Sequence, residues 1–111
     1  MKYFLYLSLW DEHNGAPGIA LFELDSEKGK AQFIRKEDER TSFGDSCISR
    51  SRNLLYLCNE TERVRGCKAE SGSICIFRID PQDGSLSEVS RVYTYCPNPC
   101  YIDIFEEGDG D

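Results

Sequence analysis

An amide and a carboxylate stand next to each other where an apolar segment of the chain ends. Asn59 and Glu60 directly follow the apolar residues 54–58. A carboxylate in such a position can accept a proton from water, and an amide can donate a hydrogen bond to an oxygen that gains negative charge. Alternatively, the pair ends a strand and contacts the basic loop that follows. Either way, the pattern places Asn59 and Glu60 where a buried strand opens onto a loop.

The next loop carries cations. Arg63 and Arg65 precede Lys68, and guanidinium groups bind phosphate or carboxylate through two parallel hydrogen bonds. The loop is therefore a candidate anion-binding segment, with a merely solvated loop as the alternative. His13 lies in a turn-rich segment, residues 11–17, and is a second candidate for substrate binding. An exposed histidine without a role is the alternative there.

The cysteines do not predict a metal site. No two of them form a CxxC pair, the chain has one histidine, and the pair Cys96 and Cys100 has only a weak resemblance to ligand spacing. Cys47, Cys58 and Cys75 lie within apolar runs, where a reduced cysteine packs as a small hydrophobic residue. The acidic residues 107–111 lack the distal glutamate of a calcium loop and favour a turn. We expect neither a metal nor a cofactor.

Short apolar runs separated by turn residues predict an all-β fold built of antiparallel four-stranded meanders. No amphipathic helix is expected. Residues 3–10 are nearly all apolar, which predicts a strand covered on both faces. The expected strands are 3–10, 19–24, 31–35, 45–49, 54–58, 74–79, 86–93 and 100–105.

One strand and its turn occur twice. Residues 19–25 match residues 74–80, and a glycine follows at Gly29 and at Gly84, a spacing of 55 positions. Repetition at about this period is typical of β-propeller blades. The chain therefore reads as about two blades in one partial propeller domain. Residues 1–40 would form an incomplete first blade, 41–95 a second blade, and 96–111 the first strand of a third.

Two blades would leave two broad apolar faces uncovered, since propellers close rings of about four to eight blades. The chain is thus expected to be a truncated product or fragment, completed by missing blades or by self-association. The longer connections gather at one end of such meanders, and we expect the functional site there.

Charge and the N-terminal run bear on partners and location. With 20 acidic and 13 basic residues the net charge is −7, which disfavours nucleic-acid binding. The apolar run at residues 3–10 is short for a signal peptide, meets Asp11 and Glu12 at once, and nothing reaches the length of a membrane span. The sequence predicts a cytoplasmic protein that binds neither nucleic acid nor membranes.

Three segments resemble the seven-bladed propeller lactonases, a family that includes 6-phosphogluconolactonases and relatives of carboxymuconate cyclases. Residues 55–60 resemble its LYxxNE strand end, residues 72–86 its GSVSxFxIDPxTGxL hairpin, and residues 98–102 its NPSY entry into an inner strand. The resemblance covers nearly the whole chain but only about two of seven blades. Tyr101 stands where the family often has histidine.

The resemblance implies hydrolysis of a small-molecule sugar lactone such as 6-phosphogluconolactone, without a cofactor. For such a hydrolysis, which needs an activated water and a stabilised oxyanion, we expect Glu60 as general base and Asn59 as hydrogen-bond donor, with substrate contacts from Arg63, Arg65, Tyr101 and His13. As an alternative, the chain is a non-catalytic propeller fragment that acts as a binding or interaction module.

Overall fold

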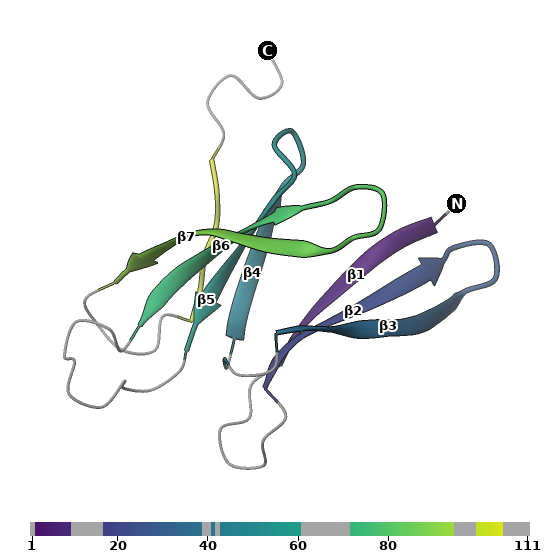
Figure 1. Cartoon of the computed structure of the whole chain (residues 1–111), viewed down its shortest axis with the longest axis horizontal. Coiled ribbons are helices and arrows are strands. Elements are labelled where there is room, and N and C mark those ends of the chain that lie inside the picture. Colours follow the sequence, from purple (N-terminus) through teal and green to yellow (C-terminus); the bar gives the residue numbers. More distant parts are fainter. Residues whose placement is uncertain are drawn as a thin grey trace.

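The chain folds into two antiparallel sheets without a helix among the residues that the structure describes. The computed structural model describes residues 2–9, 17–38, 41, 43–60, 72–94 and 100–105. Figure 1 shows the two sheets side by side. The strands are β1 (Lys2–Leu9), β2 (Gly18–Asp25), β3 (Lys30–Asp38), β4 (Phe43–Ser49), β5 (Leu54–Asn59), β6 (Ser73–Ile79) and β7 (Leu86–Tyr93). The expected all-β class is confirmed.

Each sheet is a meander in which neighbours along the chain pair with each other. Sheet A has the order β1-β2-β3, and sheet B has the order β4-β5-β6-β7. The two copies of the repeated sequence, β2 and β6, occupy equivalent places, because each pairs with the last strand of its sheet across a hairpin. Sheet A therefore corresponds to β5, β6 and β7 of sheet B. It has no described counterpart of β4.

The two equivalent hairpins close in the same way. Gly29 N–H donates to the Asp25 carbonyl at 2.9 Å, and Gly84 N–H donates to the Asp80 carbonyl at 2.7 Å. The aspartate side chains also accept backbone N–H groups two residues on, in both turns. Both glycines have positive φ, 65° and 78°, a conformation that a Cβ disfavours. The turn at residues 50–53 has no glycine, and Asn53 supplies the positive φ there, at 54°.

The core lies between the two sheets. It consists of side chains that are at least nine-tenths buried, with Tyr6, Ile79 and Leu86 packed against them. Two of the rings, Phe43 and Phe77, meet edge to face with centroids 6.2 Å apart. The buried members are Ile19, Phe43, Leu55, Leu57, Cys75 and Phe77. Because β2 contributes to this core together with β4, β5 and β6, one layer of apolar side chains stabilises both sheets.

Strand β1 attaches sheet A to sheet B through polar and apolar contacts. The Tyr6 hydroxyl donates to the Gly84 carbonyl at 2.7 Å, and the Ser8 hydroxyl donates to the Gly44 carbonyl at 2.6 Å. The Phe4 ring covers Gly84 so closely that a Cβ there would lie 2.8 Å from ring carbons. Gly84 thus serves its own turn and also the contact between the sheets.

Two expectations about strands were wrong. Strand β1 is not covered on both faces, because Tyr3, Leu5 and Leu7 are 37–48% exposed; sheet B packs on one face of sheet A only. Residues 100–105 form no strand, because no neighbouring strand pairs with them. Their attachment is instead a hydrogen bond from Ile102 N–H to the Asp45 carboxylate at 3.1 Å.

The two hairpin glycines offer a matched test of the contact between the sheets. Replacing either with alanine costs about 1 kcal/mol because φ is positive. Gly84→Ala must also displace Phe4, whereas nothing lies within 4 Å of a Cβ at Gly29. We expect Gly84→Ala to lower the free energy of unfolding by about 1–3 kcal/mol more than Gly29→Ala, measured by urea denaturation in dilute solution. Equal losses would contradict the close packing of Phe4 on the hairpin.

Candidate active site at the loop end of the sheets

The strand ends that carry the predicted site residues meet at one end of the molecule. The register pairs Leu9 with Gly18, Phe43 with Asn59, and Asn59 with Ser73. These ends lead into the longer connections, while the short turns at 26–29, 50–53 and 80–85 lie at the opposite end of the strands (Figure 1). The expected separation of short turns and long connections is confirmed for the described residues.

Asn59 makes a buried contact at the last position of β5. It is 6% exposed, and its Nδ2 donates to Ser73 Oγ on β6 at 2.9 Å. Ser73 is fully buried, so this contact satisfies a hydroxyl that would otherwise be costly to bury. Asn59 therefore fixes the end of β5 against the start of β6, and this fixes the point from which the next residue projects.

Glu60 lies over a bulge in β4. The register passes from the Phe43–Asn59 pair to the Ser46–Leu57 pair, so Gly44 and Asp45 face a single residue of β5. The place that a Cβ at residue 44 would take is filled by the Glu60 carboxylate group. Any side chain at residue 44 would displace this carboxylate. The bulge and its glycine thus create the place for Glu60.

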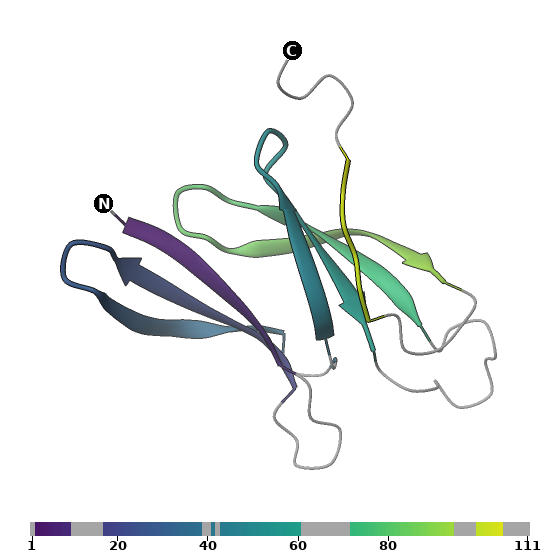
Figure 2. The same cartoon turned by 180° about the vertical axis from the view of Figure 1, so that it is seen from behind.

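A second carboxylate lies beside the same bulge. Asp45 accepts the hydrogen bond from Ile102 N–H, and so it joins β4 to the segment 100–105, which runs past β4 in Figures 1 and 2. Tyr101 precedes Ile102 and is 77% exposed. The structure therefore brings Glu60, Asp45 and the backbone beside Tyr101 to the same sheet end.

The carboxylates of this cluster also affect the pKa of two nearby thiols. Burial first, and then the carboxylates of Asp45 and Glu60, raise the pKa of Cys58 to about 11. Burial, followed by the carboxylates of Asp103 and Asp45, also raises the pKa of Cys47. Both shifts disfavour the thiolate, so neither cysteine is suited to act as a nucleophile at neutral pH.

Three of the predicted site residues, His13, Arg63 and Arg65, lie outside the described residues. The other three predicted site residues lie near one another. Asn59 and Glu60 adjoin the bulge, and Tyr101 is exposed next to it. Sequence reasoning missed Gly44 as the residue that makes room for Glu60. The signal available was a glycine directly after the apolar Phe43, near the start of an inner strand.

In the described ranges, no group of three or more His, Cys, Asp or Glu side chains could hold a metal ion. Four cysteines in those ranges, Cys47, Cys58, Cys75 and Cys100, are free thiols. No helix of the described part is long and apolar enough to cross a membrane.

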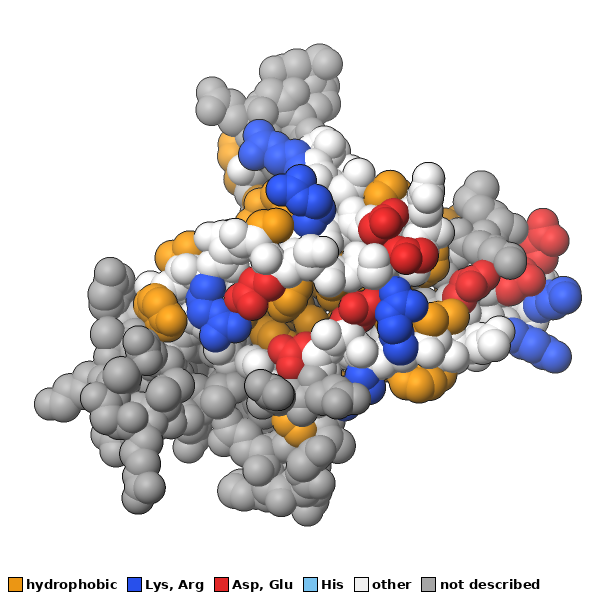
Figure 3. Space-filling view, in the orientation of Figure 1, with side chains coloured by type: hydrophobic (Ala, Val, Ile, Leu, Met, Phe, Trp, Pro, Cys, Tyr) orange, Lys and Arg blue, Asp and Glu red, His pale blue; other side chains and the backbone are white. Residues whose placement is uncertain are grey.

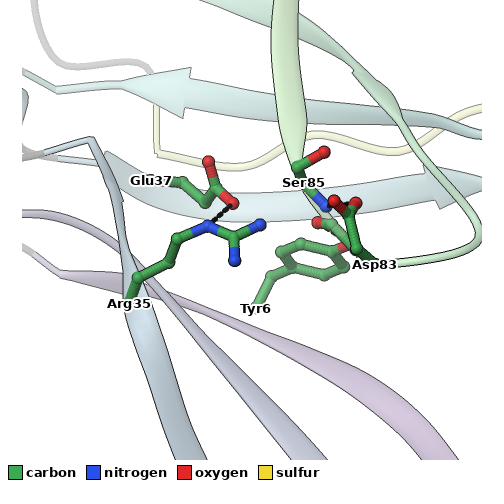
Figure 4. Close-up of polar contacts among 6 residues, drawn as sticks. Tyr6, Arg35, Glu37, Asp83 and Ser85 are labelled. Atoms are coloured by element: carbon green, nitrogen blue, oxygen red, sulfur yellow. Dashed lines mark hydrogen bonds and ion pairs between the residues drawn. The ribbon is translucent and has the colours of Figure 1, made fainter.

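A groove of about 570 Å³ also lies between the sheets near the short turns, away from Glu60. Its lining consists of Phe4, Glu23, Ile34, Arg35, Pro81, Gln82 and Asp83. Figure 4 shows Tyr6, Arg35 and Glu37 extending toward the hairpin of Asp83 and Ser85. Arg35 Nε donates to Glu37 at 2.9 Å. In Figure 3 acidic and basic side chains lie intermixed over this junction.

A model of the family described as "Lactonase, 7-bladed beta-propeller" matches residues 4–110. The match spans both sheets and the segment 100–105. Comparisons with curated proteins and with solved structures gave no match.

Alkaline pH should weaken the contact between the sheets. Burial, with the carboxylates of Glu37 and Asp83, raises the pKa of Tyr6 from 10 to about 12. The stability that this shift represents is complete below pH 10 and is lost as pH rises toward 12. Tyr6→Phe should cost about 0.5–1.5 kcal/mol at neutral pH and show a smaller alkaline loss, in urea denaturation across pH. Tyr3→Phe is the control, and an unchanged alkaline slope for Tyr6→Phe would refute the assignment.

Thiol reactivity tests the burial of Cys58. With a pKa of about 11, about one molecule in a thousand carries this thiolate at pH 8, and the side chain is fully buried. After brief iodoacetamide treatment, mass spectrometry should find the exposed Cys100 modified and Cys58 intact. Cys58 should react only after unfolding in urea. Equal modification of both in the folded chain would contradict the described packing.

Proposed function

We propose that this chain forms part of a site that hydrolyses a sugar lactone such as 6-phosphogluconolactone, because it belongs to the seven-bladed β-propeller lactonase family. The observation that carries the proposal is the position of the Glu60 carboxylate over Gly44, next to Asp45 at the loop end of the sheets. This is the sheet end where we expect catalysis.

In the proposed reaction, Glu60 accepts a proton from a water molecule as the water oxygen attacks the lactone carbonyl carbon. The carbonyl oxygen becomes an oxyanion, and its collapse breaks the bond between this carbon and the ring oxygen. The proton is delivered to that leaving oxygen, so the products are a carboxylic acid and a hydroxyl on one open chain. No redox step or cofactor is required.

Asn59 supports this reaction best as a positioning residue. One N–H of its amide donates to Ser73, and this contact holds the β5 end from which Glu60 projects. Its direct role as a donor to the oxyanion stays a prediction.

The remaining substrate contacts follow from the chemistry of the lactone. Arg63 and Arg65 are proposed to bind a phosphate on the sugar, because guanidinium groups match phosphate geometry. His13 and Tyr101 are proposed to contact the sugar. A cytoplasmic location is part of the proposal.

A binding or interaction module is the second candidate. Two observations favour it: the amide of Asn59 is engaged in a buried structural contact, and Tyr101 stands exposed where the family often has histidine. Under this proposal the loop end binds a lactone or a related anion without converting it.

Lactone turnover distinguishes the two candidates. The folded chain should open 6-phosphogluconolactone faster than the spontaneous reaction, followed by proton release in a weakly buffered solution. Glu60→Gln should lower the catalysed rate by about 10²–10⁴-fold, the usual contribution of a general base. Gly44→Ala should also lower it, because the alanine methyl displaces the carboxylate.

Glu27→Gln is the control, since Glu27 lies in the exposed turn at the other end of the strands, and it should leave the rate unchanged. A chain that is folded by circular dichroism yet gives no acceleration would contradict the enzymatic proposal. Saturable lactone binding by such a chain would support the binding module.

A further inference from the structure

Each sheet has an apolar outer face on which the other sheet does not pack, and several side chains on both outer faces are partly or well exposed in the described part of the chain. The outer face of sheet A consists of Tyr3, Leu5, Leu7, Phe22, Leu24 and Phe33. The outer face of sheet B consists of Leu54, Tyr56, Ile74, Ile76 and Val92. Phe33 is 52% exposed and Val92 is 54% exposed. Contiguous apolar faces of this kind mark interaction surfaces.

The repeat shows what each outer face is shaped to receive. Phe22 pairs with Leu5 on the outer face of sheet A, and its repeat counterpart Phe77 pairs with Leu55 on the face of sheet B that packs against sheet A. The outer face of sheet A therefore corresponds to the inner face of sheet B, the face on which sheet A packs. In the same way, the outer face of sheet B corresponds to the inner face of sheet A, the face that packs on sheet B. The two outer faces are thus complementary to each other.

One contact between the sheets, the hydrogen bond from Tyr6 to the Gly84 carbonyl, has counterparts of both partners on these outer faces. Tyr6 bonds to the carbonyl of Gly84, and its counterpart on β5 is Tyr56, since Leu5 corresponds to Leu55. The counterpart of Gly84 is Gly29, which has nothing within 4 Å of a Cβ. One outer face therefore carries a second tyrosine, and the other carries a second hairpin carbonyl.

Backbone pairing agrees with this complementarity. Within the described residues, sheet A has an open edge at β1, where sheet B has its strand β4. The segment 100–105 runs past β4 (Figure 2) without a strand partner and is attached there through Ile102. It is thus an unpaired extended segment located where a docked sheet would present its open edge.

We propose that a second copy of this chain docks head to tail, with its sheet A outer face on the sheet B outer face of the first copy. In this arrangement Tyr56 donates to Gly29 of the second copy, and residues 100–105 pair with β1 of the second copy. The four-stranded sheet so formed places Tyr101 at the same loop end as Glu60. Because the interface joins two different faces, each dimer keeps one free face of each kind and can add further copies.

Sedimentation of the full 111-residue chain over a range of concentrations tests the proposal. We expect species at multiples of the 12.7 kDa monomer that increase with concentration. Phe33→Glu and Val92→Glu each place a charge on one outer face and should weaken association about 100-fold or more. Ile48→Glu is the control: Ile48 is 44% exposed but pairs with Leu55 on the inner face, so association should persist.

Mixing the two face variants is the decisive step. Phe33→Glu keeps an intact sheet B face and Val92→Glu keeps an intact sheet A face, so an equimolar mixture should form a dimer that does not grow. All variants must show the β-sheet circular dichroism of the wild-type chain. A wild-type chain that stays monomeric when folded, or a mixture that does not dimerise, would overturn the proposal. Self-association of Val92→Glu alone would also overturn it, because it would indicate pairing between like faces.

Discussion

The packing of β1 against sheet B is the contact on which the rest of the structure depends. A three-stranded meander cannot bury its own apolar face, so sheet A is stable only where another sheet covers it. Sheet B covers it where Phe4 and Tyr6 contact the Gly84 hairpin and where Ser8 contacts the bulge of β4. The first contact sets the spacing of the sheets at the short turns, and the second sets it at the loop end.

The candidate site is a consequence of the same arrangement. Ser8 binds the carbonyl of Gly44, the residue that leaves room for the Glu60 carboxylate. Asp45 of the same bulge holds the segment 100–105. The junction between the sheets and the acidic loop end are therefore parts of one local structure, and a change at the bulge should affect both packing and chemistry.

Much of the fold could be predicted from the sequence because it depends on local patterns. Alternating apolar residues and turn residues gave the strands, and the matching Gly29 and Gly84 gave the repeat. Two features could not be read this way. The exposure of Leu5 depends on which sheets are present to cover it, and the place of Glu60 depends on a bulge in a strand distant in sequence. Both are tertiary effects, which strand patterns do not encode.

The most direct test of the central contact is a nuclear Overhauser experiment on the isotope-labelled chain. The structure predicts cross-peaks between the ring protons of Phe4 and the α-protons of Gly84, because the ring covers this glycine. The corresponding peaks should be absent at Gly29. Cross-strand peaks within each sheet without any between Phe4 and Gly84 would contradict the account, since the sheets would then form without packing on each other as described.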